Sequence, residues 1–339
     1  MAIMDLFKKK ALENPKSLIY PEGNDERVLK AAKYLLENKY LTKAGLVGNY
    51  LEIKEISKKL NFNLDNYNIE ILDPLHSDYI NDFASTFYEI RKPKGMTIDE
   101  ATRTVKTNLY FSALAVRMRF FDGFVGGAVN TTGDTVKATI FCLGMKEDIK
   151  TLSSFMIIKV PNCEYGLDGL FLFADCGVII DPISNKIVDI AKNTHDAFVS
   201  LFNEEPICAL LSYSTKGSAK GTSAIKMSEA LKIINEKYPE ILIDGELQLD
   251  AAIIPEVAKR KAPDSHLAGK ANVLIFPDLA SGNISYKIVQ RLAGAEAIGP
   301  IFHGLKFPAN DLSRGCSFED IIGVSVITIL QAKNNKNEE

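Results

Sequence analysis

The chain has 339 residues, 46% of them hydrophobic and 24% charged, and a formal net charge of −3. That length is enough for two domains with cores of their own, and a charge so close to neutral gives no broad basic surface for nucleic acid. The cysteines form no C-x-x-C pair and are odd in number, which argues against a disulfide framework or a zinc ribbon: Cys142, Cys163, Cys176, Cys208 and Cys316.

The N-terminal ten residues have no long apolar stretch behind their charges, and no apolar run along the chain is long enough to cross a bilayer. We therefore expect a cytoplasmic protein without membrane partners. The four histidines, His76, His195, His266 and His303, have no metal-ligand spacing, so no metal site is predicted.

Short apolar runs alternate with amphipathic stretches along the chain. The runs typical of strands are 17–20, 44–47, 69–72, 123–125, 155–160, 170–174, 208–212 and 273–276. Several are apolar throughout, as expected of strands that are covered on both faces. Between them, 184–202 and 225–238 carry apolar residues on one helical face. This alternation predicts an α/β fold with parallel-rich sheets and right-handed crossovers.

Two stretches are candidates for domain boundaries. Residues 144–151 are polar and follow a helical segment, and residues 294–300 are rich in glycine. We therefore predict a discontinuous α/β domain from 1–145 and 298–339, and a second α/β domain from 146–297. A cleft between two such domains is a natural ligand site.

The most informative segment is 310–320, which leads into an apolar helical run. Ser317 and Asp320 have the spacing of a capping box, which predicts that the helix begins here. Ser313 and Arg314 just before it suit a phosphate, because amide N–H groups, the positive helix end and a guanidinium converge there. The alternative is that Asp320 only caps the helix and Arg314 pairs with a surface carboxylate.

Other segments have similar anion-binding character. Arg91 begins a basic run, 91–95, that could clamp a phosphate or simply be a solvated loop. The segment 126–137 combines glycines, hydroxyls such as that of Thr132 and a lysine, Lys137, after a strand. It could hold an anion or an amide, although it lacks the Gly-Lys-Ser/Thr ending of a Walker A loop. The loop 212–218 also follows a strand and combines hydroxyls, a lysine and a glycine, so it could hold an anion in the same way. Each could also be an ordinary strand-to-helix turn.

Together these segments resemble the phosphate acetyl/butyryl transferase family. The resemblance spans almost the whole chain and rests on YPEGNDER (20–27), RKxKG (91–95), DGELQLDAA (244–252), KAPDS (261–265), FPDLxSGNI (276–284) and NDLSRG (310–315). It implies two α/β domains like those of isocitrate and isopropylmalate dehydrogenases, a homodimer, and a site in the cleft between the domains. It also implies reversible acetyl transfer between acetyl phosphate and coenzyme A (CoA), with both as substrates and no other cofactor.

The resemblance also implies roles for particular residues. In the family, the serine and arginine of the Ser-Arg-Gly motif and a following aspartate line the site, and they correspond here to Ser313, Arg314 and Asp320. The arginine of the basic motif corresponds to Arg91. We expect the substrate-binding set to be completed by Thr132, Lys137 and Asn283.

Two positions depart from the family pattern. Lys137 stands where the family usually has an arginine, and His303 where it commonly has a glutamine. Lysine keeps the charge but loses the planar two-pronged contact with phosphate.

A mechanism follows as a hypothesis. The CoA thiol, with an ordinary pKa of about 8.5, needs a base, and we expect Asp320 to be that base with a pKa raised by burial. Ser313 would hydrogen-bond the developing oxyanion, and Arg314 would favour the thiolate or bind phosphate. Arg91 and Lys137 would hold the acyl phosphate, and transfer would be direct, within a ternary complex.

Three alternatives stay open. The chain could prefer butyryl phosphate, or it could be a non-catalytic module that senses CoA esters. A decarboxylating dehydrogenase of the same architecture would need a cluster of metal-binding aspartates, and no convincing one is present.

Overall fold

The computed structural model describes residues 3–147 and 149–334. The chain divides into two compact units: unit 1 comprises Met1–Lys146 and Leu305–Glu339, and unit 2 comprises Glu147–Gly304. The predicted boundary at 297/298 falls inside strand β10 (Glu296–His303). Because β10 pairs antiparallel with β5 (Ser153–Lys159), the whole strand belongs to unit 2.

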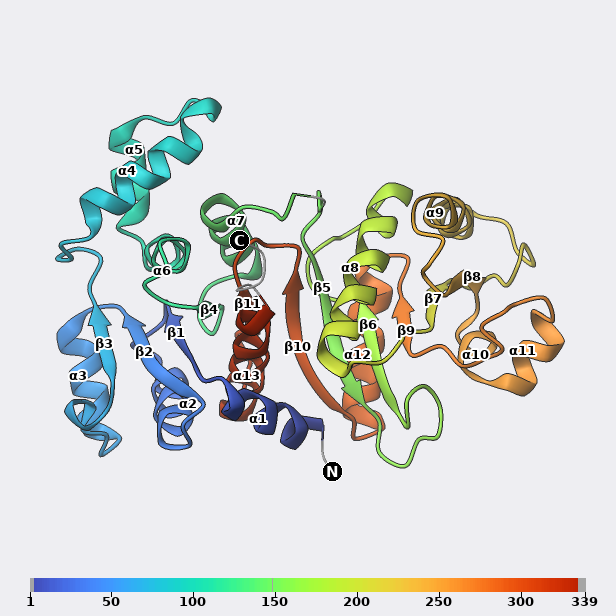
Figure 1. Ribbon diagram of the computed structural model, residues 1–339, viewed down its shortest axis with the longest axis horizontal. Helices are drawn as coiled ribbons and strands as arrows, with labels where there is room; N and C mark the ends of the chain where they lie inside the picture. Colours follow the sequence, from blue (N-terminus) through green and yellow to red (C-terminus); the bar gives the residue numbers. More distant parts are fainter. Residues whose placement is uncertain (1–2, 148, 335–339) are drawn as a thin grey trace. The chain divides into compact units, whose positions relative to one another are not determined.

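Unit 1 is built on a five-stranded parallel sheet with the strand order β11-β4-β1-β2-β3 (Figure 1). The strands are β1 (Lys16–Tyr20), β2 (Leu41–Val47), β3 (Ile69–Leu72), β4 (Gly123–Gly126) and β11 (Ala309–Asp311). Because all five are parallel, the segments that follow them emerge at one edge of the sheet, which is where ligands of such folds usually bind.

The helices of unit 1 are α1 (Ile3–Glu13), α2 (Glu26–Glu37), α3 (Tyr50–Lys59), α4 (Ile80–Arg91), α5 (Ile98–Val105), α6 (Asn108–Arg117), α7 (Thr132–Leu143) and α13 (Phe318–Asn334), with short 3-10 turns at Leu64–Asn66 and Lys92–Lys94. Helix α13 contacts α1, α2 and strands β1, β4 and β11, whereas α6 and α7 contact each other. All residues of α13 from 321 to 330 are buried, so the last helix of the chain forms part of the unit 1 core.

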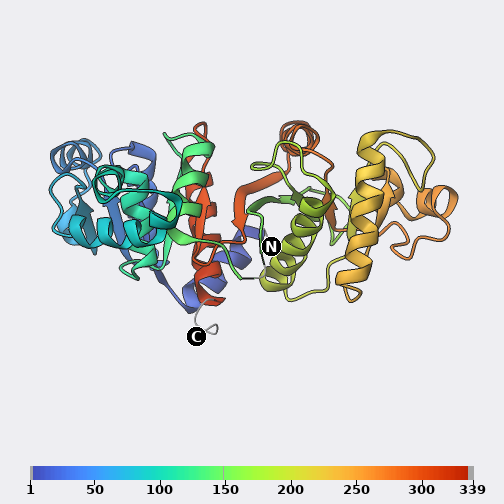
Figure 2. The same ribbon diagram turned by 90° about the horizontal axis from the view of Figure 1, so that it is seen from above.

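Unit 2 has a six-stranded mixed sheet with the order β10-β5-β6-β9-β7-β8. Strands β6 (Leu170–Ala174), β9 (Val273–Ile275), β7 (Cys208–Leu211) and β8 (Ile243–Leu247) are parallel, while β5 runs antiparallel to both of its neighbours. The helices are α8 (Ser184–Phe202), α9 (Thr222–Lys237), α10 (Leu249–Ile253), α11 (Pro255–Lys261) and α12 (Leu279–Leu292), and α8 packs against α9 (Figure 2).

The predicted α/β fold with parallel-rich sheets is confirmed, and each predicted strand overlaps an observed one. Strands β8, β10 and β11 were not predicted. No helix within residues 3–147 and 149–334 has both the length and the apolar character of a membrane span.

The backbone of unit 1 comes too close to Gly127 for any residue with a side chain. Gly127, directly after β4, has φ +104°, and a Cβ there would lie 2.2 Å from Oδ1 of Asp311 and 2.7 Å from the carbonyl oxygen of Leu312. The amide of Leu312 donates to the carbonyl of Gly126 at 2.7 Å, which holds the two strand ends together. The side chain of Asp311 therefore occupies the space that a larger residue at position 127 would need.

We expect Gly127→Ala to lower the free energy of unfolding by roughly 2–4 kcal/mol, because backbone strain and a steric clash add. Gly133→Ala is the matched control: Gly133 lies inside α7, where the nearest atom to an added Cβ is 3.8 Å away, and alanine favours a helix. Chemical denaturation of both variants tests this, and equal denaturation midpoints would contradict the steric argument.

Candidate functional site

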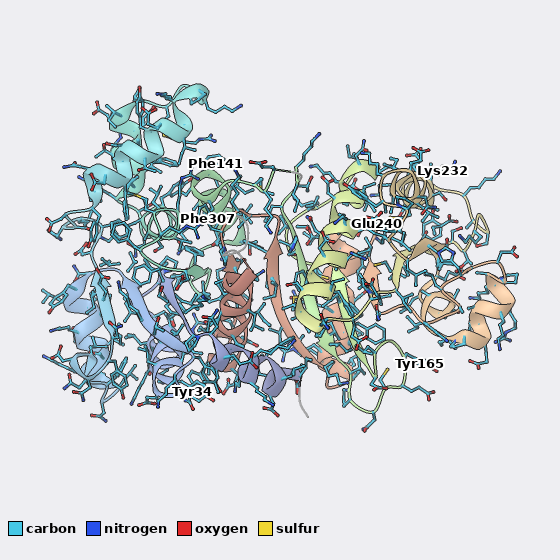
Figure 3. All side chains as sticks on the ribbon, in the orientation of Figure 1. Tyr34, Phe141, Tyr165, Lys232, Glu240 and Phe307 are labelled. Carbon is cyan, nitrogen blue, oxygen red and sulfur yellow. The ribbon has the colours of Figure 1, made fainter. Side chains whose placement is uncertain are left out.

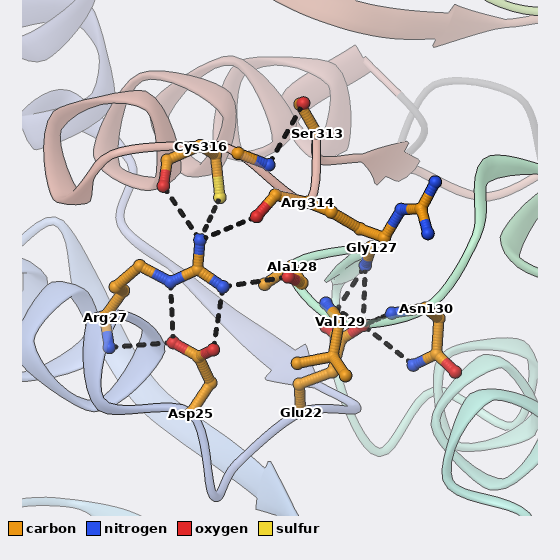
Figure 4. A network of polar contacts seen from close by, with 11 residues as sticks. Glu22, Asp25, Arg27, Gly127, Ala128, Val129, Asn130, Ser313, Arg314 and Cys316 are labelled. Atoms are coloured by element: carbon orange, nitrogen blue, oxygen red, sulfur yellow. Dashed lines mark hydrogen bonds and ion pairs between the residues drawn. The ribbon is translucent and has the colours of Figure 1, made fainter.

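The buried carboxylate of Glu22 organises the edge of the unit 1 sheet where β1 and β4 end. Its side chain accepts hydrogen bonds from the backbone amides of Gly127 at 2.9 Å, Val129 at 3.3 Å and Asn130 at 3.2 Å. It also accepts one from the side-chain amide of Asn130 at 2.8 Å (Figure 4). A buried charge needs such partners, and together they fix the turn that leads from β4 into α7.

Arg27, in the first turn of α2, ties this turn to the segment before α13. Its Nη1 donates to the carbonyl oxygens of Arg314 at 3.0 Å and Cys316 at 2.9 Å, and its Nη2 donates to that of Ala128 at 2.8 Å. It is also ion-paired with Asp25 at 2.8 Å (Figure 4). Burial acts to raise the pKa of Asp25, but hydrogen bonds and charge from Arg27 outweigh it and lower that pKa.

The predicted site residues Ser313 and Arg314 lie on the turn that Arg27 holds. The carbonyl oxygen of Arg314 accepts a hydrogen bond from Arg27. The guanidinium of Arg314 points away from that network (Figure 4) and has no partner among the described residues. Both side chains are exposed, and in the described part of the chain Ser313 Oγ accepts a single hydrogen bond, from the amide of Gly315 at 3.3 Å. The backbone of this turn is thus fixed while its cation and hydroxyl are available to a ligand.

Asp320 caps α13, as its spacing from Ser317 predicted. It accepts from the amide of Ser317 at 2.8 Å, and its own amide donates to Ser317 Oγ at 3.1 Å, which completes a capping box. The expected burial of this carboxylate is not found, because the first turn of α13 is exposed there.

Thr132 and Asp311 form a pair that connects the N-terminus of α7 with the end of β11. Thr132 Oγ1 lies 2.6 Å from Asp311 Oδ2, and Asp311 is 0% exposed. Its Oδ1 is buried and has no hydrogen-bond partner among the described residues. Burial raises the pKa of Asp311 to about 7 against the hydroxyls of Thr132 and Thr135, and the charge of Glu22 adds to the rise.

The predicted site residues Arg91 and Lys137 meet on one aromatic ring, that of Phe141 in α7 (labelled in Figure 3). Cζ of Arg91 lies 3.8 Å from the ring centroid, and Nζ of Lys137 lies 5.9 Å from it. Nε of Arg91 is buried without a partner in the described part of the chain. Two cations are therefore held on one face of α7, a helix that begins at Thr132.

Lys137 also lines a pocket of about 490 Å³ between the ends of β1 and β4 and the start of α6. Its other lining side chains include Asn24, Tyr110, Asn130 and Asp134. This pocket mixes amide, phenol, carboxylate and ammonium groups, so it offers both donors and acceptors to a polar ligand.

Asn283 is the one predicted site residue in unit 2. Its side-chain amide donates to the carbonyl of Cys176 at 3.1 Å, and it lines a mainly apolar pocket of about 670 Å³ with Ile180, Lys226 and Asp278 among other residues. His303, at the end of β10, belongs to unit 2 as well. The other predicted site residues, Arg91, Thr132, Lys137, Ser313, Arg314 and Asp320, all belong to unit 1, whereas Asn283 belongs to unit 2.

Sequence reasoning named no role for Glu22, Arg27 or Asp311, although all three lie inside the motifs that carried the family resemblance. Their contacts join positions more than 100 residues apart, so local spacing held no signal for them. Within the described residues, no group of three or more His, Cys, Asp and Glu side chains is placed to hold a metal ion.

Comparisons with known proteins show the family of the chain. Residues 2–329 match the family described as phosphate acetyl/butaryl transferase. The chain is 46% identical over 333 residues to the phosphate acetyltransferase of Acetivibrio thermocellus, an alignment that covers 98% of this chain and 99% of the relative.

Solved structures give the same result. A phosphotransacetylase from Streptococcus pyogenes superimposes with a TM-score of 0.90 at 38% identity, covering 98% of each chain. A 4-hydroxythreonine-4-phosphate dehydrogenase from Klebsiella pneumoniae shares the fold, with a TM-score of 0.53 at 9% identity over 94% of this chain and 98% of the other. With residues 2–329 matched, the chain belongs to the phosphate acetyl/butaryl transferase family.

Proposed function

We propose that this protein transfers an acetyl group reversibly between acetyl phosphate and CoA. The observation that carries the proposal is the Ser313–Arg314 turn just before α13, on the same unit as Arg91 and Lys137, where the Arg314 guanidinium has no partner among the described residues. A dianionic phosphate needs this kind of cationic and N–H-rich surface. The names of the full-length relatives support acetyl transfer in particular.

Arg91, Lys137 and Thr132 are the proposed contacts for the acyl phosphate. Arg91 offers a planar guanidinium whose Nε has no partner among the described residues, and Lys137 adds a second positive charge on the same ring. Thr132 adds a hydroxyl at the N-terminus of α7, where the helix dipole also favours an anion.

The chemical step is a direct displacement. We propose that Asp320 accepts the proton of the CoA thiol once bound CoA has displaced the water around its carboxylate. The sulfur then attacks the carbonyl carbon, a C–S bond forms, and the bond from that carbon to the phosphate oxygen breaks, so that phosphate leaves with the electron pair. Ser313 hydrogen-bonds the carbonyl oxygen as it becomes negative, and Arg314 offsets negative charge on sulfur or phosphate.

Asn283 is proposed as a substrate contact from the family resemblance alone. CoA enters as a substrate, and the proposal requires no further cofactor. A homodimer and a cytoplasmic location stay predictions of the sequence.

A coupled assay with acetyl phosphate and CoA tests the function directly, with butyryl phosphate measured alongside. We expect acetyl-CoA to form, with a higher kcat/KM for acetyl phosphate than for butyryl phosphate. A purified chain that binds CoA but forms no thioester would instead support a CoA-sensing module.

Asp320→Asn should lower kcat by about 10²- to 10⁴-fold while the KM values for both substrates stay nearly unchanged, because a proton acceptor is lost and the side-chain shape is kept. Ser317→Ala is the matched control, since it removes the hydroxyl of the capping box and leaves the carboxylate. If the two variants lose activity equally, or if Asp320→Asn turns over normally, Asp320 is only a helix cap.

For Arg91→Ala we expect the KM for acetyl phosphate to rise roughly 10- to 100-fold, the usual cost of losing a hydrogen bond to a charged group, with little change for CoA. Lys94→Ala, an exposed lysine of the same basic motif, serves as the control and should leave both KM values alone. A change confined to CoA would mean that Arg91 holds the other substrate.

Arg27→Lys should lower kcat/KM by about tenfold or more, because a lysine cannot bridge Arg314, Cys316 and Ala128 at the same time. Arg103→Lys, an exposed substitution on α5, is the control and should be neutral. Steady-state kinetics decide, and wild-type kcat/KM in Arg27→Lys would show that the turn keeps its form without the guanidinium.

A further inference from the structure

The pair formed by Thr132 and Asp311 has a property that the proposed mechanism does not use. Asp311 is fully buried, and among the described residues only one of its two oxygens has a hydrogen-bond partner, the Thr132 hydroxyl at 2.6 Å. The other oxygen faces Gly127, where the absence of a side chain leaves just enough room for it. A buried carboxyl oxygen without a partner is costly, and it is far more costly when the group is charged.

The Thr132 hydroxyl has a single proton, so its direction depends on Asp311. If Asp311 is ionised, it can only accept, and the hydroxyl must donate to it. Thr132 would then turn lone pairs toward any ligand. If Asp311 is protonated, the carboxyl can donate to Thr132, and the hydroxyl proton becomes free to donate outward. A phosphate dianion has only acceptor oxygens, so it requires the second arrangement.

The surroundings of Asp311 favour its protonated form. Burial is the main cause that raises the pKa of Asp311, and it outweighs the hydroxyls of Thr132 and Thr135 on α7 and the Leu312 amide, which all lower that pKa. The negative charge of Glu22 also raises the pKa of Asp311. The Glu22 carboxylate accepts hydrogen bonds from N–H donors, and it repels a second negative charge on Asp311. Asp134, also on α7, accepts from the Thr131 hydroxyl at 2.7 Å.

We propose that Asp311 is a positioning residue whose protonated carboxyl orients the Thr132 hydroxyl to donate to a phosphate oxygen of the substrate. This inference rests on the proposed function, in which Thr132 contacts the acyl phosphate. Asp311 itself does not touch the substrate.

The sign of the pH dependence follows. The pKa of Asp311 is raised to about 7 by burial, so the protonated form dominates below that pH and is lost above it. Affinity for the phosphate group should be full near pH 6 and fall as the pH rises through about 7. Between about pH 6 and pH 8 the protonated fraction changes by about tenfold, which sets the largest expected change in affinity.

Sulfate is the probe for binding, because it keeps its charge over this range whereas inorganic phosphate titrates near neutrality. Calorimetry on the wild-type chain should give a Kd for sulfate several-fold lower at about pH 6 than at about pH 8. In Asp311→Asn the amide N–H₂ takes the place of the carboxyl O–H, so sulfate should bind tightly at both values. In Thr132→Val it should bind weakly at both. The KM for acetyl phosphate should follow the same three patterns.

The inference is overturned if Asp311→Asn keeps the pH dependence of the wild type, or if it binds sulfate as weakly as Thr132→Val at low pH. Wild-type binding that is absent, or equal at both pH values, also overturns it. Should Asp311→Asn fail to fold, Thr132→Val decides alone, because the pH dependence must vanish with the hydroxyl. A wild-type chain that forms no acetyl-CoA contradicts the proposed function, whereas the sulfate titrations still report the coupling of Asp311 to Thr132.

Discussion

The burial of charge at one edge of the unit 1 sheet is the constraint on which the rest of the structure depends. Glu22 is 3% exposed, and its carboxylate is stable there only because a turn of backbone amides and one side-chain amide point at it. The same backbone turn fixes the position at which α7 begins. Arg27 satisfies the carbonyls of the neighbouring segments in the same way. Structural stability and the position of the site residues thus come from the same hydrogen bonds.

The layered α/β fold could be read from the sequence because most strands are short apolar runs. Strands β8 and β11 were not predicted because they carry polar residues in buried positions. Strand β11 is only Ala309–Asp311, and two of its three residues are polar and buried. Asn310 is accommodated by hydrogen bonds to Thr328 and Gln331 of α13, partners that no local pattern reveals. Strand β8 likewise carries Asp244 and Glu246 in buried positions.

The candidate site could be predicted only in part, and the division follows the range of the interactions. The cap formed by Ser317 and Asp320 is local and was predicted, but the exposure of Asp320 depends on the surroundings and was not. The cations at 91 and 137 were recognised by residue type, whereas their meeting on Phe141 needs the folded chain. Asp311 went unnoticed because its chemistry arises from the loss of water around it rather than from its neighbours in sequence.

The discontinuous make-up of unit 1 has a consequence for biosynthesis. The hydroxyls of Tyr20 and Ser325 hydrogen-bond in the core across 305 positions of the chain. During translation, the first strands leave the ribosome long before β11 and α13, while unit 2 is already complete. During that interval the edge of β4 lacks its partner strand β11, and an unpaired strand edge can bind chaperones or associate wrongly with other chains. The Ser313–Arg314 turn follows unit 2 in the sequence, so unit 1 gains this turn only after all of unit 2 has been synthesised.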